Sequence, residues 1–162
     1  MLPGQKQEAE ALRVAITRGF AAVADAVAWA DRVIVADPRP DWALLDISLA
    51  GRGSPADMIT LLRDVPGEVD HESVMRDVLA RMLRALDADA ARAERIANSL
   101  YWMKSDGDLP DEPFGWEPYT IADVFALARV GTYGSRDEAV RELRRYLHAH
   151  AASEPQVPED AR

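Results

Sequence analysis

Apolar residues in the middle of the chain return every three or four positions, which is the spacing of one face of an α-helix. In residues 72–104 the pattern forms two runs, separated by the polar stretch Asp87-Ala88-Asp89. The first run comprises Val74, Val78, Leu79, Met82, Leu83 and Leu86, and the second comprises Ala93, Ile96, Ala97, Leu100 and Tyr101. Two amphipathic helices joined by a short polar break predict an antiparallel helix hairpin with one shared apolar seam.

Similar spacing predicts four helices before this hairpin. They are expected over residues 5–18, 20–36, 42–50 and 55–65. In the third of them, Trp42, Leu45 and Leu49 would face inward. Residues 33–35 also fit a short buried strand, and residues 45–49 alternate between apolar and polar as a strand would. Periodicity alone leaves helix and strand open for these two stretches.

Capping residues mark several helix starts, because a side chain that accepts a backbone N–H bond favours the first turn. Such starts occur at Ser54 with Asp57, at Thr120 with Asp123 and at Ser135 with Glu138. The last two helices are therefore expected over residues 120–130 and 135–150. Residues 105–119 contain three prolines and two glycines, so we expect no regular element there.

These patterns predict an all-α fold, a compact helical bundle or array of roughly seven helices around the central hairpin. A length of 162 residues suits a single domain, expected over residues 5–150. Residues 151–162 contain two prolines and no apolar pattern, which predicts a flexible C-terminal tail. No repeat of constant length is present, so a solenoid is not expected.

The charge balance narrows the class of partner. A net charge of -9 argues against nucleic acid and anionic lipid, and favours a basic protein partner. The most apolar stretch, residues 19–36, is interrupted by Asp25, Asp31 and Arg32, so we expect no membrane span. Without cysteine the chain has no disulfide, thiolate zinc site or thiol nucleophile. Its first residues lack a signal-peptide pattern, and a cytoplasmic location is expected.

The most distinctive polar segment is residues 105–119, because residues 105–128 contain carboxylates but no basic residue. Aromatic side chains surrounded by carboxylates suit a surface rich in arginine or lysine. The candidate partner-binding residues are Asp106, Asp108, Asp111, Glu112, Trp116 and Glu117. In the simpler alternative, Phe114 and Trp116 hold the loop against the core and the carboxylates only solvate it.

Metal and catalytic chemistry find little support in the sequence. Asp106, Asp108 and Glu117 match the first, third and twelfth positions of an EF-hand loop, but Asp111 occupies the sixth position, where the turn requires glycine. Two of the histidines, His148 and His150, point to different faces of a helix, and His71 has no nucleophile beside it in any motif. No phosphate loop, serine elbow or zinc-protease motif occurs, so we expect no cofactor, metal site or catalytic residue.

One short segment has a known counterpart. The sequence of residues 40–51, PDWALLDISLAG, resembles the phosphoacceptor strand of response-regulator receiver domains. The resemblance implies an α/β fold in which Asp46 accepts a phosphoryl group beside magnesium, and residues 33–37 resemble the strand with the family's acidic metal ligands. The spacing departs from the family, because the helix and strand that should separate these segments are missing.

We expect a non-enzymatic acidic protein-binding module that docks or neutralises a basic protein partner, as immunity and adaptor proteins do. The alternatives are a receiver-like signalling domain that uses Asp46, and a metal-dependent enzyme that uses the carboxylates of residues 105–119. A homo-oligomeric scaffold is a third alternative. Reversing the charges of Asp106, Asp108, Asp111 and Glu112 is expected to abolish partner binding without changing the melting temperature.

Overall fold

The computed structural model describes residues 4–152 and is all-α over that range. Its elements are α1 (Gln5–Arg18), α2 (Val23–Ala36), α3 (Trp42–Leu49), α4 (Pro55–Asp64), α5 (His71–Ala88), the 3-10 turn η1 (Ala90–Arg92), α6 (Ala93–Ser105), α7 (Asp111–Phe114), α8 (Glu117–Arg129) and α9 (Arg136–His150). The predicted fold class is confirmed. Residues 33–49 contain the end of α2 and all of α3, so the strand alternative is wrong.

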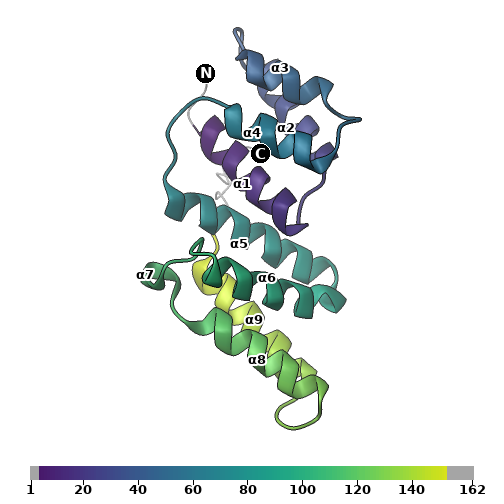
Figure 1. Cartoon of the computed structure of the whole chain (residues 1–162), viewed down its shortest axis with the longest axis vertical. Helices are drawn as coiled ribbons and strands as arrows, with labels where there is room; N and C mark the ends of the chain where they lie inside the picture. The colour runs from purple at the N-terminus through teal and green to yellow at the C-terminus, as the bar shows by residue number, and fades with distance from the viewer. Residues whose placement is uncertain (1–3, 153–162) are drawn as a thin grey trace, which may run out of the picture.

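The helices stack along the long axis of the molecule, with α3 at one end and the α8–α9 connection at the other (Figure 1). The N-terminal core contains Ala9, Leu12, Ile16, Ala26, Trp29, Ala30, Leu44, Ile47, Met58, Leu62 and Val65. The C-terminal core is built from the buried apolar residues of α5, α6, α8 and α9, together with Leu109 and Phe114. Helix α1 joins the two cores, because Ala11 and Val14 on its other side belong to the C-terminal core.

The predicted central hairpin is present as α5 and α6. Helix α6 runs back along α5 after the turn at η1 (Figure 1), and the apolar faces of both helices lie in the C-terminal core. The two helices share these faces with other neighbours, because α5 packs chiefly on α1 and α9 while α6 packs chiefly on α8. The hairpin therefore forms the middle of the stack, and its apolar residues pack against α1, α8 and α9 as well as against each other.

Two of the three predicted capping boxes are confirmed. The Ser54 hydroxyl accepts the Asp57 N–H at 3.1 Å, and the Ser135 hydroxyl accepts the Glu138 N–H at 3.2 Å. The predicted start at Thr120 is wrong, because α8 already begins at Glu117. Pro118 fits the first turn of that helix, where an N–H has no helical partner. Residues 105–119 are also less irregular than predicted, since they contain the single turn α7.

Helix α3 exposes the residues that were predicted to face inward. Trp42 and Leu49 are 80% and 85% exposed, and Leu45 is half-buried, whereas Leu44 and Ile47 are fully buried. The start of the helix matches the prediction, because the Asp41 carboxylate accepts the Ala43 N–H at 2.9 Å. The error arises because α3 is apolar on both sides while α2 and α4 cover only one of them.

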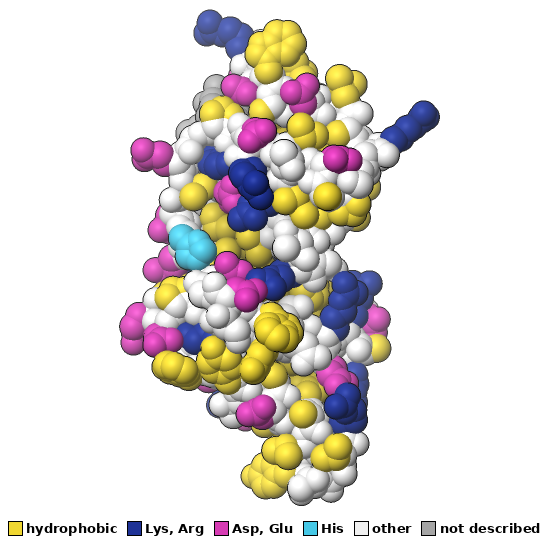
Figure 2. Space-filling view, in the orientation of Figure 1, with side chains coloured by type: hydrophobic (Ala, Val, Ile, Leu, Met, Phe, Trp, Pro, Cys, Tyr) yellow, Lys and Arg dark blue, Asp and Glu magenta, His cyan; other side chains and the backbone are white. Residues whose placement is uncertain are grey.

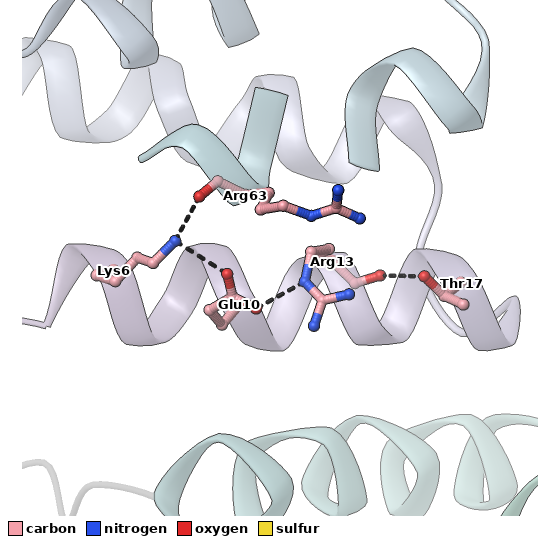
Figure 3. Close-up of polar contacts among 5 residues, drawn as sticks. All are labelled: Lys6, Glu10, Arg13, Thr17 and Arg63. Carbon is pink, nitrogen blue, oxygen red and sulfur yellow. Dashed lines mark hydrogen bonds and ion pairs between the residues drawn. The ribbon is translucent and has the colours of Figure 1, made fainter. Parts of the chain in front are cut away.

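Polar contacts fasten α1 to the end of α4 (Figure 3). Lys6 Nζ donates to Glu10 Oε1 at 2.9 Å and to the Arg63 carbonyl oxygen at 2.7 Å. Arg13 Nε donates to the other oxygen of Glu10 at 2.6 Å. Burial raises the pKa of Glu10, but the hydrogen bonds from Arg13 and Lys6 outweigh burial, so that this pKa lies below its ordinary value.

The C-terminal end of the described chain turns back onto α5. The Ala152 N–H donates to the Arg76 carbonyl oxygen at 3.0 Å, and the Arg76 side chain donates to the His150 carbonyl oxygen at 3.1 Å. The predicted tail of residues 151–162 lies outside the described residues, except for its first two alanines. Within residues 4–152, no helix is long and apolar enough to cross a membrane.

Candidate functional site

The candidate site lies where the chain leaves α6, passes through α7 and enters α8 (Figure 1). Arg18, the last residue of α1, crosses from the neighbouring helix to meet it. Its Nη2 atom lies 2.8 Å from a carboxylate oxygen of Asp106 and 2.8 Å from one of Asp108. Burial lowers the pKa of Arg18, but the hydrogen bonds to both carboxylates prevail and raise it above its ordinary value. Two of the candidate carboxylates therefore share one internal cation, and the three side chains together keep a single negative charge.

A buried lysine neutralises a third carboxylate. The Lys104 side chain is only 3% exposed, and its Nζ donates to Asp111 Oδ1 at 2.6 Å. The same ammonium lies 5.2 Å from the centroid of the Trp116 ring, within the range of a cation–π interaction. Lys104 thus links the acidic segment to the indole that the sequence singled out.

Hydrogen bonds to the loop backbone fasten it to two other helices. The Tyr146 hydroxyl of α9 donates to the Phe114 carbonyl oxygen at 3.0 Å, and the bond is buried. His71 Nε2 of α5 donates to the Asp108 carbonyl oxygen at 2.8 Å. Burial, with the nearby charge of Glu117, raises the pKa of Tyr146 far above its ordinary value, so the hydroxyl keeps its proton.

Four aromatic rings lie in contact beside the loop, the two tryptophans exposed and the two tyrosines half-buried; they are called here the aromatic surface: Tyr101, Trp102, Trp116 and Tyr119. The ring centroids of Tyr101 lie 5.4 Å from Trp102 and 5.2 Å from Tyr119, and Trp116 lies 5.8 Å from Tyr119. Trp102 is 58% exposed and Trp116 is 62% exposed. Figure 2 shows acidic side chains at α7, with hydrophobic side chains over the adjoining parts of α6 and α8.

The remaining candidate carboxylates, Glu112 and Glu117, are exposed. Within residues 4–152, neither forms a hydrogen bond or an ion pair through its side chain. Glu117 lies in the first turn of α8, where the helix dipole favours a negative charge. With Arg18 and Lys104 set against the five carboxylates, the site keeps a net charge of -3, and Glu112 and Glu117 carry two of these charges.

The two aromatic residues of the loop differ in position. Phe114 is fully buried in the C-terminal core, as expected if it only holds the loop in place. Trp116 is not used in this way, because most of its ring is exposed and its contacts are with Lys104 and Tyr119. An exposed indole on a fastened loop is available to another molecule.

Sequence reasoning missed the two cations that pair with carboxylates of the loop, Arg18 and Lys104. Lys104 closely precedes the acidic segment and could have been considered, but its burial depends on the packing of α6. Arg18 is separated from Asp106 by 88 positions, and no local pattern connects them. The pairing of Arg18 with Asp106 follows only from the packing of α1 beside α5.

The other candidate residues lie apart from this site. Asp46 is exposed in the middle of α3, whereas a receiver places its phosphoacceptor at the end of a strand, so the implied receiver fold is wrong. His148 is exposed, while the His150 ring stacks near Tyr146 with centroids 4.5 Å apart. Burial lowers the pKa of His150 and the charge of Arg76 lowers it further, against the opposing effect of Glu117. No group of three or more His, Asp or Glu residues among residues 4–152 is placed to hold a metal ion.

Comparisons of the chain with protein-family models, with curated proteins and with solved structures found no match.

Proposed function

We propose that the protein is a non-enzymatic acidic binding module that docks a basic protein partner on the aromatic surface and the adjoining loop. The observation that carries the proposal is the exposure of Trp102 and Trp116 on a patch of touching rings. Tryptophan and tyrosine are enriched among residues that dominate binding energy, because they remove large areas from water at a small cost in side-chain entropy.

The fastening of the loop supports this function. Arg18 and His71 hold the start of the loop, at residues 106–108, and Tyr146 holds Phe114 near its end. A loop that is already ordered loses little conformational entropy when a partner binds, so more of the contact energy appears as affinity. The loop therefore presents Trp116 in a position that does not need to form on binding.

The charge of the surface supports a basic partner. Glu112 and Glu117 are exposed and lie close to Trp116 along the chain, and neither forms an ion pair among the described residues. The whole chain carries a net charge of -9. An arginine- or lysine-rich surface would be attracted over long range and could also stack on the rings. A partner of the opposite sign would be repelled by the same charges.

The test begins with affinity capture from the source cells, using the intact chain as bait. The recovered partner is then titrated against wild type, Trp116→Ala and Glu112→Lys. We expect Trp116→Ala to weaken binding by about 2 kcal/mol or more, as for a central aromatic anchor. We expect Glu112→Lys to weaken binding by about 1 kcal/mol, and more at low salt than at high salt.

Matched controls separate this surface from the rest of the molecule. Tyr133→Ala removes an aromatic side chain that is exposed in the α8–α9 connection, and Asp64→Lys reverses an exposed charge at the end of α4. Both should bind the partner as wild type does. Wild-type affinity in Trp116→Ala, or an acidic protein as the only specific partner, would contradict the proposal.

The structure also changes which carboxylates are suitable for charge reversal. Asp106, Asp108 and Asp111 take part in ion pairs with Arg18 and Lys104, so reversing them would remove internal contacts as well as charge. The melting temperature should then fall, contrary to the expectation from sequence. Glu112 forms no such pair in the described part of the chain, and it gives the cleaner test.

A further inference from the structure

A second apolar surface lies between α2 and α3, the helices at one end of the stack (Figure 1). It is a groove of about 440 Å³, lined by Asp31, Ile34, Val35, Trp42, Leu45, Asp46, Ser48 and Leu49. Val35 is 89% exposed, more than either Trp42 or Leu49. Large apolar side chains gathered on one exposed face are uncommon in a protein that works alone and are typical of an interaction surface.

The shape of the groove suits a helix. Trp42, Leu45 and Leu49 lie at helical spacing along the outer face of α3, and Ile34 and Val35 of α2 form the opposite wall. Helix α3 has eight residues, so its outer face extends for about 12 Å, or about two helical turns. A short amphipathic helix can place apolar residues from successive turns into such a groove.

The charge of the groove indicates which kind of helix it would bind. Both charged residues that line it are acidic, Asp31 on α2 and Asp46 on α3. Asp31 accepts a hydrogen bond from the Ser48 hydroxyl, which ties the two walls together. Asp46 is exposed, and the described residues offer it no ion pair. Arginine or lysine beside the apolar stripe of a bound helix would meet these carboxylates.

A second copy of this chain fits the groove less well. In a symmetric pair the same patch lies on both sides of the interface, so four carboxylates would share one interface with no arginine or lysine among the lining residues. Like charges placed together at an interface oppose association. A basic helix meets the same apolar surface without that repulsion.

We propose that the α2–α3 groove binds a short amphipathic helix whose apolar stripe is flanked by arginine or lysine. This is a docking site separate from the aromatic surface, and it does not depend on the function proposed for that surface.

The test uses the intact chain and a displayed library of helical peptides of about 14 residues. Apolar residues are fixed at helical spacing, and every other position varies freely among Glu, Gln and Lys. We expect the recovered peptides to be enriched in lysine over glutamate at positions beside the stripe. Enrichment in glutamate, or no recovery of peptides above the background, would overturn the proposal.

Substitutions in the chain then identify the surface on which the recovered peptide binds. Leu49→Gln should weaken its binding by about tenfold or more, and Asp46→Asn by a smaller factor that diminishes at high salt. Val130→Gln, at an exposed valine near the end of α8, is the matched control and should bind as wild type does. All three positions are exposed, so an unchanged melting temperature is expected and checks that each variant is folded.

Three results would contradict this assignment. Wild-type affinity in Leu49→Gln would show that the peptide binds elsewhere. Loss of peptide binding in Trp116→Ala would move the peptide to the aromatic surface and leave the groove without an occupant. Self-association of the free chain that disappears in Leu49→Gln, measured by sedimentation, would assign the groove to a second copy.

Discussion

In the C-terminal half, α5, α6, α8 and α9 turn most of their large apolar residues into one core, whereas in the N-terminal half α3 presents such residues both to the core and to solvent. The C-terminal half exposes its aromatic rings at the ends of helices, beside a loop that ion pairs and hydrogen bonds fasten. The N-terminal half exposes a whole helix face. The comparison separates two kinds of surface, one preorganised and charged, the other broad and apolar.

The comparison also distinguishes apolar residues that are buried in a core from apolar residues that remain outside it. Leu44 and Ile47 anchor α3 in the N-terminal core, whereas Trp42 and Leu49 lie outside that core. At the loop, Phe114 serves as the anchor while Trp116 remains outside. In both halves, apolar residues beyond those needed for packing mark the proposed docking surfaces.

The largest expected effect separates the two faces of α3. Leu44→Ala should lower the free energy of unfolding by about 2–5 kcal/mol, because it leaves a cavity in the N-terminal core. Leu49→Ala, five positions along the same helix, should change it by less than about 0.5 kcal/mol. Urea denaturation followed by circular dichroism measures both. Equal losses would contradict the assignment of inner and outer faces.

The next effect concerns the fastening of the loop. Arg18→Met removes the cation between Asp106 and Asp108 and should cost about 1–2 kcal/mol of unfolding free energy, since the guanidinium bonds to both carboxylates and the side chain is only 19% exposed. Amide hydrogen exchange should become faster in residues 105–109. Arg52→Met, at an exposed arginine in the α3–α4 connection, is the control and should leave both measurements unchanged. Unaltered exchange in Arg18→Met would show that this contact does not order the loop.

A smaller effect is expected from the buried hydroxyl of α9. Tyr146→Phe leaves the Phe114 carbonyl without its donor and should cost about 0.5–1.5 kcal/mol. Tyr133→Phe removes a hydroxyl from an exposed ring and should have no measurable effect. Thermal unfolding of the two variants in parallel provides the comparison. A loss in Tyr133→Phe as large as that in Tyr146→Phe would place the effect outside the loop anchor.

The smallest effect is pH-dependent and belongs to the contact between α1 and α4. Because the pKa of folded Glu10 lies below its ordinary value of 4.5, its ionisation stabilises the fold above that pH. This contribution should disappear as pH falls through the folded pKa. The stability difference between wild type and Glu10→Gln should therefore be largest near neutral pH and shrink below pH 4.5. A pH-independent difference for Glu10→Gln would contradict the account.

Local patterns predicted the helices well, because periodicity and capping act within a few residues. The boundaries at Gly19, Ser54 and Ser135 are set by contacts between near neighbours in the sequence. The start of α8 was missed because Pro118 was taken as a helix breaker, although its missing N–H makes it suitable for a first turn. The outward side of α3 could not be predicted, since a short helix that is apolar on both sides has no pattern to distinguish them.

The composition of the candidate site was predictable, but its state of charge was not. The sequence placed the carboxylates with Trp116 and Tyr119 in one segment, and the structure adds Tyr101 and Trp102 of α6 to the same series of contacting rings. The pairing of Arg18 with Asp106 and Asp108 depends on long-range packing that no spacing reveals. The free carboxylates could therefore be narrowed to Glu112 and Glu117 only with the fold in hand.

The most direct measurement is the hydrogen-exchange footprint of the captured protein partner on the intact chain. If the aromatic surface is the docking site, amides of residues 101–119 should be protected in the complex, while those of residues 31–49 should exchange as in the free chain. Protection confined to residues 31–49, with residues 101–119 unchanged, would contradict the central claim and place the partner on the α2–α3 groove instead.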